Sequence, residues 1–188
     1  MRKLKVQVHM SLDGFVAGPA GENDFIFVTG GKDPASFQKV VELAETSDTI
    51  LLGRKMTGDF VKHWENVADN QPDSPEYDFA KLLVNMKKIV FSKTQKNISG
   101  RNLTVENGDL ATVVKALKQQ PGKDILVYGG ASFVRSLIDL KVVDEYYIIR
   151  TPVAIGEGMR IFSGRTILQL QSADAYKNGK VINKYLPV

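Results

Sequence analysis

Thr49-Ile50-Leu51-Leu52-Gly53-Arg54-Lys55-Met56-Thr57 is an apolar strand that passes through one glycine into the start of a helix. A second stretch, Asp124-Ile125-Leu126-Val127-Tyr128-Gly129-Gly130-Ala131-Ser132-Phe133, repeats this order of strand, glycine and helix. Glycine lets a bound group approach the backbone, and the helix that follows presents unpaired N–H groups at the positive end of its dipole. Two such turns predict a dinucleotide with two phosphate regions, although each turn alone is equally typical of an ordinary strand-to-helix connection.

The rest of the chain predicts an α/β fold with a mostly parallel central sheet. The apolar runs at 50–52, 88–91 and 125–128 lack alternation, as expected of strands buried on both faces, while 4–10 alternates with a period of two. Helices are predicted where Asp33-Pro34, Ser74-Pro75-Glu76 and Asp109 precede apolar residues at helical spacing.

The C-terminal part of the chain changes this rhythm. Residues 146–152, 166–171 and 179–185 are typical of strands and have no helix-length segment between them, so they require antiparallel pairing. We found no repeat, linker or change of composition that would divide the chain. We therefore expect a single domain spanning residues 1–188, with helices flanking the sheet and antiparallel strands at its end.

Composition excludes several classes of site. The chain has 188 residues, no cysteine, a net charge of +4 and only two histidines, His9 and His63, far apart in sequence. No disulfide framework, thiol nucleophile or local metal-binding spacing is available, so we expect no metal. The sequence lacks a signal peptide or a membrane-spanning run, which favours a cytoplasmic protein.

The nucleotide-binding motifs of the common folds are missing. No Gly-x-Gly-x-x-Gly follows the first strand, and no P-loop or Gly-x-Ser-x-Gly sequence occurs. The chain instead resembles dihydrofolate reductase-like proteins, most closely the reductase domain of the bifunctional riboflavin-biosynthesis deaminase/reductase and its stand-alone bacterial relatives. The resemblance rests on motifs in a shared order: Ser11-Leu12-Asp13-Gly14-Phe15-Val16-Ala17, Leu52-Gly53-Arg54-Lys55, Phe91-Ser92-Lys93-Thr94, Tyr128-Gly129-Gly130-Ala131-Ser132 and Pro152-Val153-Ala154-Ile155-Gly156-Glu157-Gly158.

This resemblance implies NADPH bound across the ends of the central strands. The phosphates would lie at the helix start, the adenosine ribose beside a serine and a lysine that favour NADPH over NADH, and the nicotinamide against the end of the first motif. The residues implied are Gly53, Arg54, Lys55 and Thr57 for the phosphates; Ser92 and Lys93 for the adenosine ribose; Gly129, Gly130, Ala131 and Ser132 where the backbone approaches the pyrophosphate and nicotinamide side; and Val16 and Ala17 against the nicotinamide ring.

The substrate side departs from the family pattern. Dihydrofolate reductases carry an acidic residue on the helix before the Gly-Arg turn, whereas the equivalent position here falls at Ser36-Phe37. We therefore expect a small molecule other than dihydrofolate, a pyrimidine- or pterin-like heterocycle or a carbonyl compound. Asp24 and Phe25 are the substrate candidates, in a loop from Gly18 that would cover the site.

In hydride transfer the cofactor carries the chemistry. The protein has only to align the nicotinamide with an electrophilic carbon and to supply a proton. Asp13 is the catalytic candidate, with Asp24 and Glu157 as weaker ones, although Asp-Gly is also a common structural turn. His9 is expected at the sheet surface or a pocket wall, and Lys87-Lys88 at a solvated strand entrance.

Two other functional classes compete with a reductase. A non-catalytic nucleotide-binding or regulatory domain of the same fold would keep the cofactor groove without the reaction. A nucleic-acid-binding module is favoured only by the basic charge, so we expect no nucleic-acid or membrane partner. The C-terminal strands could pair across a two-fold axis, which predicts a homodimer.

Overall fold

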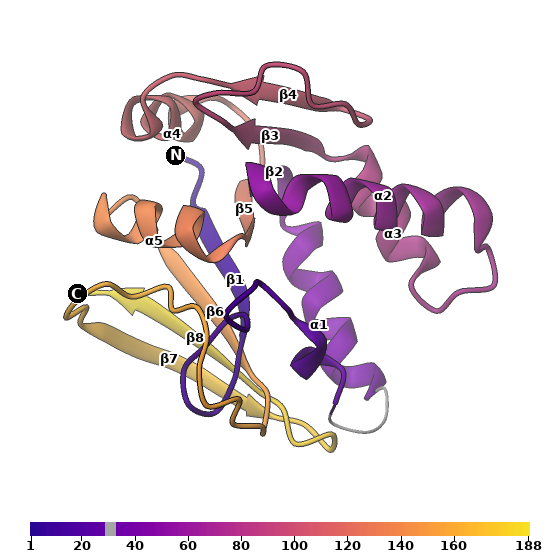
Figure 1. Cartoon of the computed structure of the whole chain (residues 1–188), viewed down its shortest axis with the longest axis vertical. Helices are drawn as coiled ribbons and strands as arrows, with labels where there is room; N and C mark the ends of the chain where they lie inside the picture. Colours follow the sequence, from indigo (N-terminus) through magenta and orange to yellow (C-terminus); the bar gives the residue numbers. More distant parts are fainter. Residues whose placement is uncertain (29–32) are drawn as a thin grey trace.

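An eight-stranded sheet forms the centre of the molecule (Figure 1), seen in a computed structural model that describes residues 1–28 and 33–188. The sheet order is β4-β3-β2-β5-β1-β6-β8-β7. The strands are β1 (Leu4–Met10), β2 (Ser47–Gly53), β3 (Lys87–Phe91), β4 (Leu103–Glu106), β5 (Asp124–Gly129), β6 (Glu145–Arg150), β7 (Leu168–Ala175) and β8 (Val181–Pro187). Strands β1 to β6 pair in parallel, whereas β8 pairs antiparallel with both β6 and β7. The predicted α/β class with antiparallel C-terminal strands is confirmed.

Helices cover both faces of the parallel part of the sheet (Figure 1). Side chains of α1 (Pro34–Glu45) and α3 (Tyr77–Asn85) join one apolar core, and α2 (Arg54–Asn70) packs against it. Side chains of α4 (Leu110–Gln119) and α5 (Ala131–Asp139) join a second core on the opposite face. A short 3-10 helix, η1 (Asp24–Ile26), precedes α1. The central strands are thus enclosed, which explains their continuous apolar runs.

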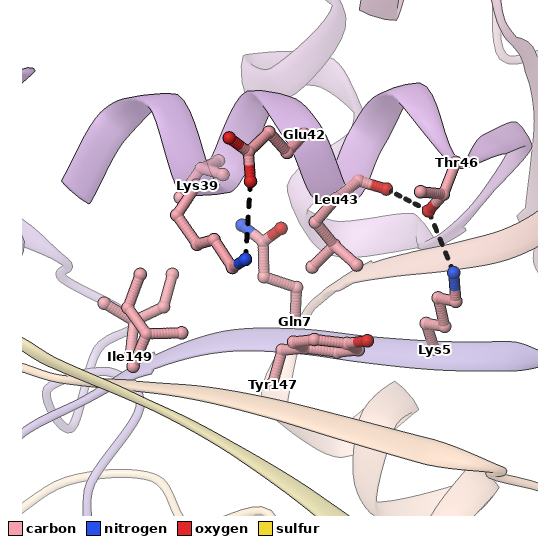
Figure 2. Close-up of a pocket in the computed structure, with 10 residues that line it drawn as sticks. Lys5, Gln7, Lys39, Glu42, Leu43, Thr46, Tyr147 and Ile149 are labelled. Atoms are coloured by element: carbon pink, nitrogen blue, oxygen red, sulfur yellow. Dashed lines mark hydrogen bonds and ion pairs between the residues drawn. The ribbon is translucent and has the colours of Figure 1, made fainter. Parts of the chain in front are cut away.

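Strand β1 shows the predicted alternation, but both of its faces are buried. Leu4, Val6, Val8 and Met10 belong to the core on the α4 and α5 side. The alternate side chains of Lys5 and Gln7 are only 5% and 4% exposed. Because α1 covers this face of β1 (Figure 2), Lys5 and Gln7 are enclosed within the fold rather than turned to water.

The solvated strand entrance predicted at Lys87-Lys88 is wrong for Lys88, which is 2% exposed. Its Nζ donates to the carbonyl oxygens of Leu83, Val84 and Met86 at 2.8–2.9 Å. These carbonyls lie at the end of α3, where backbone acceptors lack helical partners. Burial lowers the pKa of the Lys88 ammonium to about 8. Lys88 therefore caps the C-terminal end of α3 from the interior of the protein.

Other elements differ from the predictions in extent. The strand predicted at 146–152 ends at Arg150, and the one predicted at 166–171 runs on to Ala175. Strand β4 was not predicted, because its four residues are half-buried or exposed and carry no apolar run. It forms only by pairing with β3 at the edge of the sheet.

Candidate functional site

Four neighbouring parallel strands end at one edge of the sheet and bring the predicted cofactor residues together. In sheet order, β3, β2, β5 and β1 end at Phe91, Gly53, Gly129 and Met10. Leu52 is in register with Gly129, so the two glycine turns stand side by side. At about 4.8 Å between strands, the edge from β3 to β1 spans roughly 14 Å.

Each glycine at this edge has a local steric reason. A Cβ on Gly53 would lie 2.8 Å from the Cβ of Phe133, so glycine allows β2 to end against α5. Gly129 has a φ of +114°, a conformation that disfavours other residues. A Cβ on Gly130 would meet nothing within 4 Å. The backbone is therefore open to an approaching group at Gly130.

The helices that follow the two turns begin without a side-chain cap. Neither Gly53 before α2 nor Gly130 before α5 has a side chain that could accept the first N–H groups. By contrast, Asp33 and Asp109 cap α1 and α4 through hydrogen bonds of 2.9 Å. The free N–H groups of α2 and α5 are consequently available to an anion.

Cationic side chains surround these helix starts. Arg54, Lys55 and Lys93 are exposed, and none of them forms an ion pair with the residues that the structure describes. Ser92 is buried and its Oγ accepts a hydrogen bond of 2.9 Å from the backbone N–H of Gln95. These three cations are free to meet a charged ligand.

Thr57 does not face this edge. Its side chain is fully buried and its hydroxyl donates to the carbonyl oxygen of Gly53 at 3.1 Å. The sequence-based assignment of Thr57 to phosphate binding is therefore corrected, because the hydroxyl closes the first turn of α2 instead. Ala131 is half-buried and Ser132 exposed at the start of α5.

The loop after β1 is fastened to the segment before β7. Ala17 forms an antiparallel bridge with Met159: the N–H of Met159 donates to the carbonyl oxygen of Ala17 at 2.8 Å, and the N–H of Val16 donates to the carbonyl oxygen of Met159 at 2.9 Å. Gly158 permits this contact, because a Cβ there would lie 2.2 Å from the carbonyl oxygen of Ala17. Two motifs far apart in sequence thus form one wall beside the end of β1.

Asp13 is a structural part of the same wall. Its carboxylate accepts hydrogen bonds from the Ser11 hydroxyl at 2.6 Å and from the backbone N–H groups of Gly156 and Ile155 at 2.7 and 3.1 Å. The Ser11 hydrogen bond in particular, and these N–H groups, hold the pKa of Asp13 below its usual value. A carboxylate held ionised in this way is a poor proton donor, so the geometry favours a turn anchor over the catalytic role predicted from sequence.

The two substrate candidates have different environments. Phe25 is 3% exposed and anchors η1, whereas the Asp24 side chain is exposed. The ammonium of Lys180 donates to the carbonyl oxygen of Ile26 at 3.0 Å, which ties η1 to the turn before β8. Of the predicted pair, only Phe25 points into the protein.

Sequence reasoning missed buried polar atoms on the sheet face that α1 and α2 cover. Gln7 Oε1, His9 Nδ1 and the Tyr128 hydroxyl are buried and have no hydrogen-bond partner among the described residues. Burial, together with the nearby Lys180 cation, lowers the pKa of His9 to about 3, and burial raises the pKa of Tyr128. The sequence signal for this face was the set of polar residues that alternate with the apolar ones along β1. Buried polar atoms usually find hydrogen-bond partners, so polar residues on a central strand pointed to this face.

Residues 1–28 and 33–188 lack both a membrane-spanning helix and a metal-binding cluster. Within these ranges no helix has the length and apolar character needed to cross a membrane. The same residues contain no group of three or more His, Asp and Glu side chains arranged to hold a metal ion.

The chain matches one protein-family model and two proteins of Bacillus subtilis. The model of the RibD C-terminal domain matches residues 2–183. The chain is 32% identical to the Bacillus subtilis protein YyaP over 183 residues, which cover 96% of this chain and 92% of YyaP. It is 26% identical to YwjB of the same organism, over 86% of this chain and 83% of YwjB.

Solved structures show the same fold. A Shewanella sp. PV-4 protein named for riboflavin biosynthesis superposes with a TM-score of 0.76 at 20% identity, over 99% of each chain. The Thermotoga maritima diaminohydroxyphosphoribosylaminopyrimidine deaminase/5-amino-6-(5-phosphoribosylamino)uracil reductase gives a TM-score of 0.67 at 16% identity, over all of this chain and 57% of that one. At these identities the likeness concerns the fold alone.

Proposed function

The chain belongs to the RibD C-terminal domain family, and from that premise we propose that it is an NADPH-dependent reductase of the riboflavin-biosynthesis type, acting on a small molecule. The observation that carries this proposal is the pair of uncapped helix starts at Gly53 and Gly130, side by side at one sheet edge. Two neighbouring sites of free N–H groups suit the two linked phosphates of a dinucleotide.

The residues at the edge fit NADPH in the order of the strands. Ser92 and Lys93, directly after β3, would hold the adenosine ribose and its phosphate. The α2 start, with Arg54 and Lys55, and the α5 start, with Ala131 and Ser132, would bind the pyrophosphate. Val16 and Ala17 after β1 would orient the nicotinamide. When bound, the cofactor supplies the hydride, and the protein contributes alignment and the exclusion of water.

The α1 side of the molecule supports a substrate other than dihydrofolate. Asp33 caps its own helix, Glu42 pairs with Lys39 and Glu45 is exposed, so α1 offers no unpaired carboxylate to the interior. Ser36 is buried and its hydroxyl donates to the Asp33 carbonyl oxygen at 3.0 Å. We propose an uncharged heterocycle or a carbonyl compound as the substrate.

A fluorescence titration with NADPH tests the central part of this proposal. We expect saturable binding at micromolar concentrations, and failure to bind either NADPH or NADH below millimolar would refute it. NADPH binding without oxidation across a panel of heterocycles and carbonyl compounds would favour the non-catalytic nucleotide-binding alternative.

Gly130→Ala tests the backbone approach specifically. The added methyl meets nothing within 4 Å in the protein, so the melting temperature should change little, but it would stand in the path of the pyrophosphate. We expect NADPH to bind at least about tenfold more weakly, the loss of roughly 1.4 kcal/mol. Gly164→Ala is the matched control, since its methyl also meets nothing. Equal affinity of the two variants for NADPH would contradict the assignment.

Lys93→Glu tests the preference for NADPH. If Lys93 meets the 2′-phosphate, the reversed charge should weaken NADPH binding by tenfold or more and NADH binding far less. Lys96→Glu, an exposed lysine three residues away, provides the control. Equal losses for NADPH and NADH would argue against this contact.

A further inference from the structure

Methionine supplies all the sulfur of this chain, because the sequence has five methionines and no cysteine. Met10 and Met86 are buried, at 7% and 5% exposed, whereas Met1 is 84% exposed at the start of the chain. Met56 and Met159 are half-buried. An oxidant dissolved in water therefore reaches the thioethers of Met1, Met56 and Met159 before those of the other two.

Met56 lies at the sheet edge where the two glycine turns stand side by side. It is the third residue of α2, directly after Arg54-Lys55. A Cβ on Gly129 would lie 3.5 Å from the Sδ of Met56, so the sulfur stands beside the second glycine turn. Four residues further along α2, the Phe60 ring packs against the Tyr128 ring with their centroids 5.6 Å apart. One face of α2 thus covers the end of β5, with the Met56 thioether at the glycine turn.

Open space and backbone donors lie on one side of this sulfur, and an apolar core lies on the other. Gly130 precedes α5 without a side-chain cap, so the first N–H groups of α5 have no helical acceptor. A Cβ on Gly130 would meet nothing within 4 Å among the described residues. Met56 also packs against the core that contains Leu52 and Leu126. A polar atom added to the sulfur is therefore favoured toward the α5 start, where donors are available, over the core.

We propose that Met56 is a site of reversible oxidation that controls cofactor binding at this edge, an inference that rests on the proposed function. A hydroperoxide transfers one oxygen atom to the Met56 sulfur. Its O–O bond breaks, an S–O bond forms, and the departing oxygen takes the peroxide proton and leaves as water or an alcohol. The sulfur is oxidised and the peroxide is reduced. The product is a sulfoxide, a polar group that sulfoxide reductases convert back to the thioether.

The sulfoxide oxygen would accept a hydrogen bond from the N–H groups at the start of α5. The pyrophosphate of the proposed cofactor needs the same donors, so the sulfoxide and NADPH would compete for them. Oxidation of Met56 should consequently weaken NADPH binding. By the reciprocity of linked equilibria, bound NADPH should disfavour the sulfoxide, and it should also shield the sulfur from peroxide.

The test is limited treatment of the full chain with hydrogen peroxide, followed by peptide mass spectrometry and a fluorescence titration with NADPH. Met56 should gain one oxygen atom before Met10 and Met86 do. The NADPH dissociation constant should rise at least about tenfold as Met56 is oxidised, because hydrogen bonds to a charged group are lost. Saturating NADPH should slow the oxidation of Met56 but not that of Met1. An unchanged dissociation constant after oxidation of Met56 would overturn the proposal.

Two matched variants assign the effect to a single sulfur. Met56→Leu keeps a similar apolar volume without the thioether, so peroxide should change its NADPH dissociation constant by less than about twofold. Met159→Leu removes the other half-buried thioether and should keep the full peroxide effect. Treatment of the oxidised wild-type protein with methionine sulfoxide reductases should restore its affinity. A peroxide effect that persists in Met56→Leu would contradict the assignment.

Hydrogen exchange gives a readout that needs no cofactor. In the absence of NADPH, oxidation of Met56 should slow the exchange of the backbone N–H groups of residues 130–133, because the sulfoxide oxygen pairs with them. Unchanged exchange at these residues would overturn the proposal whatever the protein binds. Failure of the unoxidised protein to bind NADPH would instead refute the proposed function and leave this measurement valid.

Discussion

One face of β1 carries only apolar side chains and the other carries Lys5, Gln7 and His9, yet both faces lie inside the molecule. The apolar face is satisfied by packing against α4 and α5. On the polar face only Lys5 is fully paired, through Thr46 and Asp124. The difference indicates that the apolar face stabilises the fold, whereas the polar face retains buried atoms without a partner among the described residues.

The largest effect should come from breaking the apolar face. Leu4 is fully buried, so Leu4→Ala should lower the free energy of unfolding by about 3 kcal/mol through lost burial and a residual cavity. Urea unfolding monitored by circular dichroism measures this. Ile167→Ala, at a side chain 63% exposed, should cost less than about 0.5 kcal/mol. Similar losses in both variants would contradict the central position of β1.

A smaller effect should appear when the polar face is titrated. The pKa of His9 is about 3 in the folded protein and about 6.5 in the unfolded chain. Between pH 3 and 6.5 the His9 imidazole therefore binds a proton only when the chain is unfolded. Stability should therefore fall as pH drops through this window, by about 2 kcal/mol between pH 7.5 and 5.0. Glu145, with a folded pKa of about 2 and an ordinary value of 4.5, adds its loss mainly below pH 4.5.

Substitution separates the His9 contribution from other groups. In His9→Gln the decrease between pH 7.5 and 5.0 should become smaller by most of this amount, because the titrating group is gone. His63→Gln, at an exposed residue of α2, should retain the full decrease. If both variants followed the wild-type pH profile, His9 would not be the group responsible.

The smallest effect is expected at Gln7. Gln7→Leu removes a buried acceptor that has no partner and adds apolar contact, so the free energy of unfolding should stay the same or rise by about 1 kcal/mol. A loss above 2 kcal/mol would show that Gln7 has an essential structural partner, such as a buried water.

The glycine turns were predictable because they depend on local features. A strand, a glycine and a helix start are adjacent in the chain, and the backbone rules that join them do not require distant contacts. The same local logic placed the caps at Asp33 and Asp109, which the structure has where the sequence indicated them. The order of the motifs then identified the fold.

The errors arose where a distant element changed the environment of a residue. Lys88 was expected in solvent, but the end of α3 supplies three carbonyl acceptors that make its burial tolerable. Thr57 turned inward, and Asp13 acquired backbone donors from a segment more than 140 residues away. Strand β4 exists only because β3 offers it an edge.

The sequence by itself determined the α/β class, the two glycine turns and the set of cations beside them, because periodicity, turn chemistry and helix starts are local properties. Only the tertiary structure decided that the turns stand side by side, that Asp13 anchors a wall, and that α1 encloses the polar face of β1. Those outcomes depend on strand order and on which helix covers which face, and both are set by contacts between residues far apart in the chain.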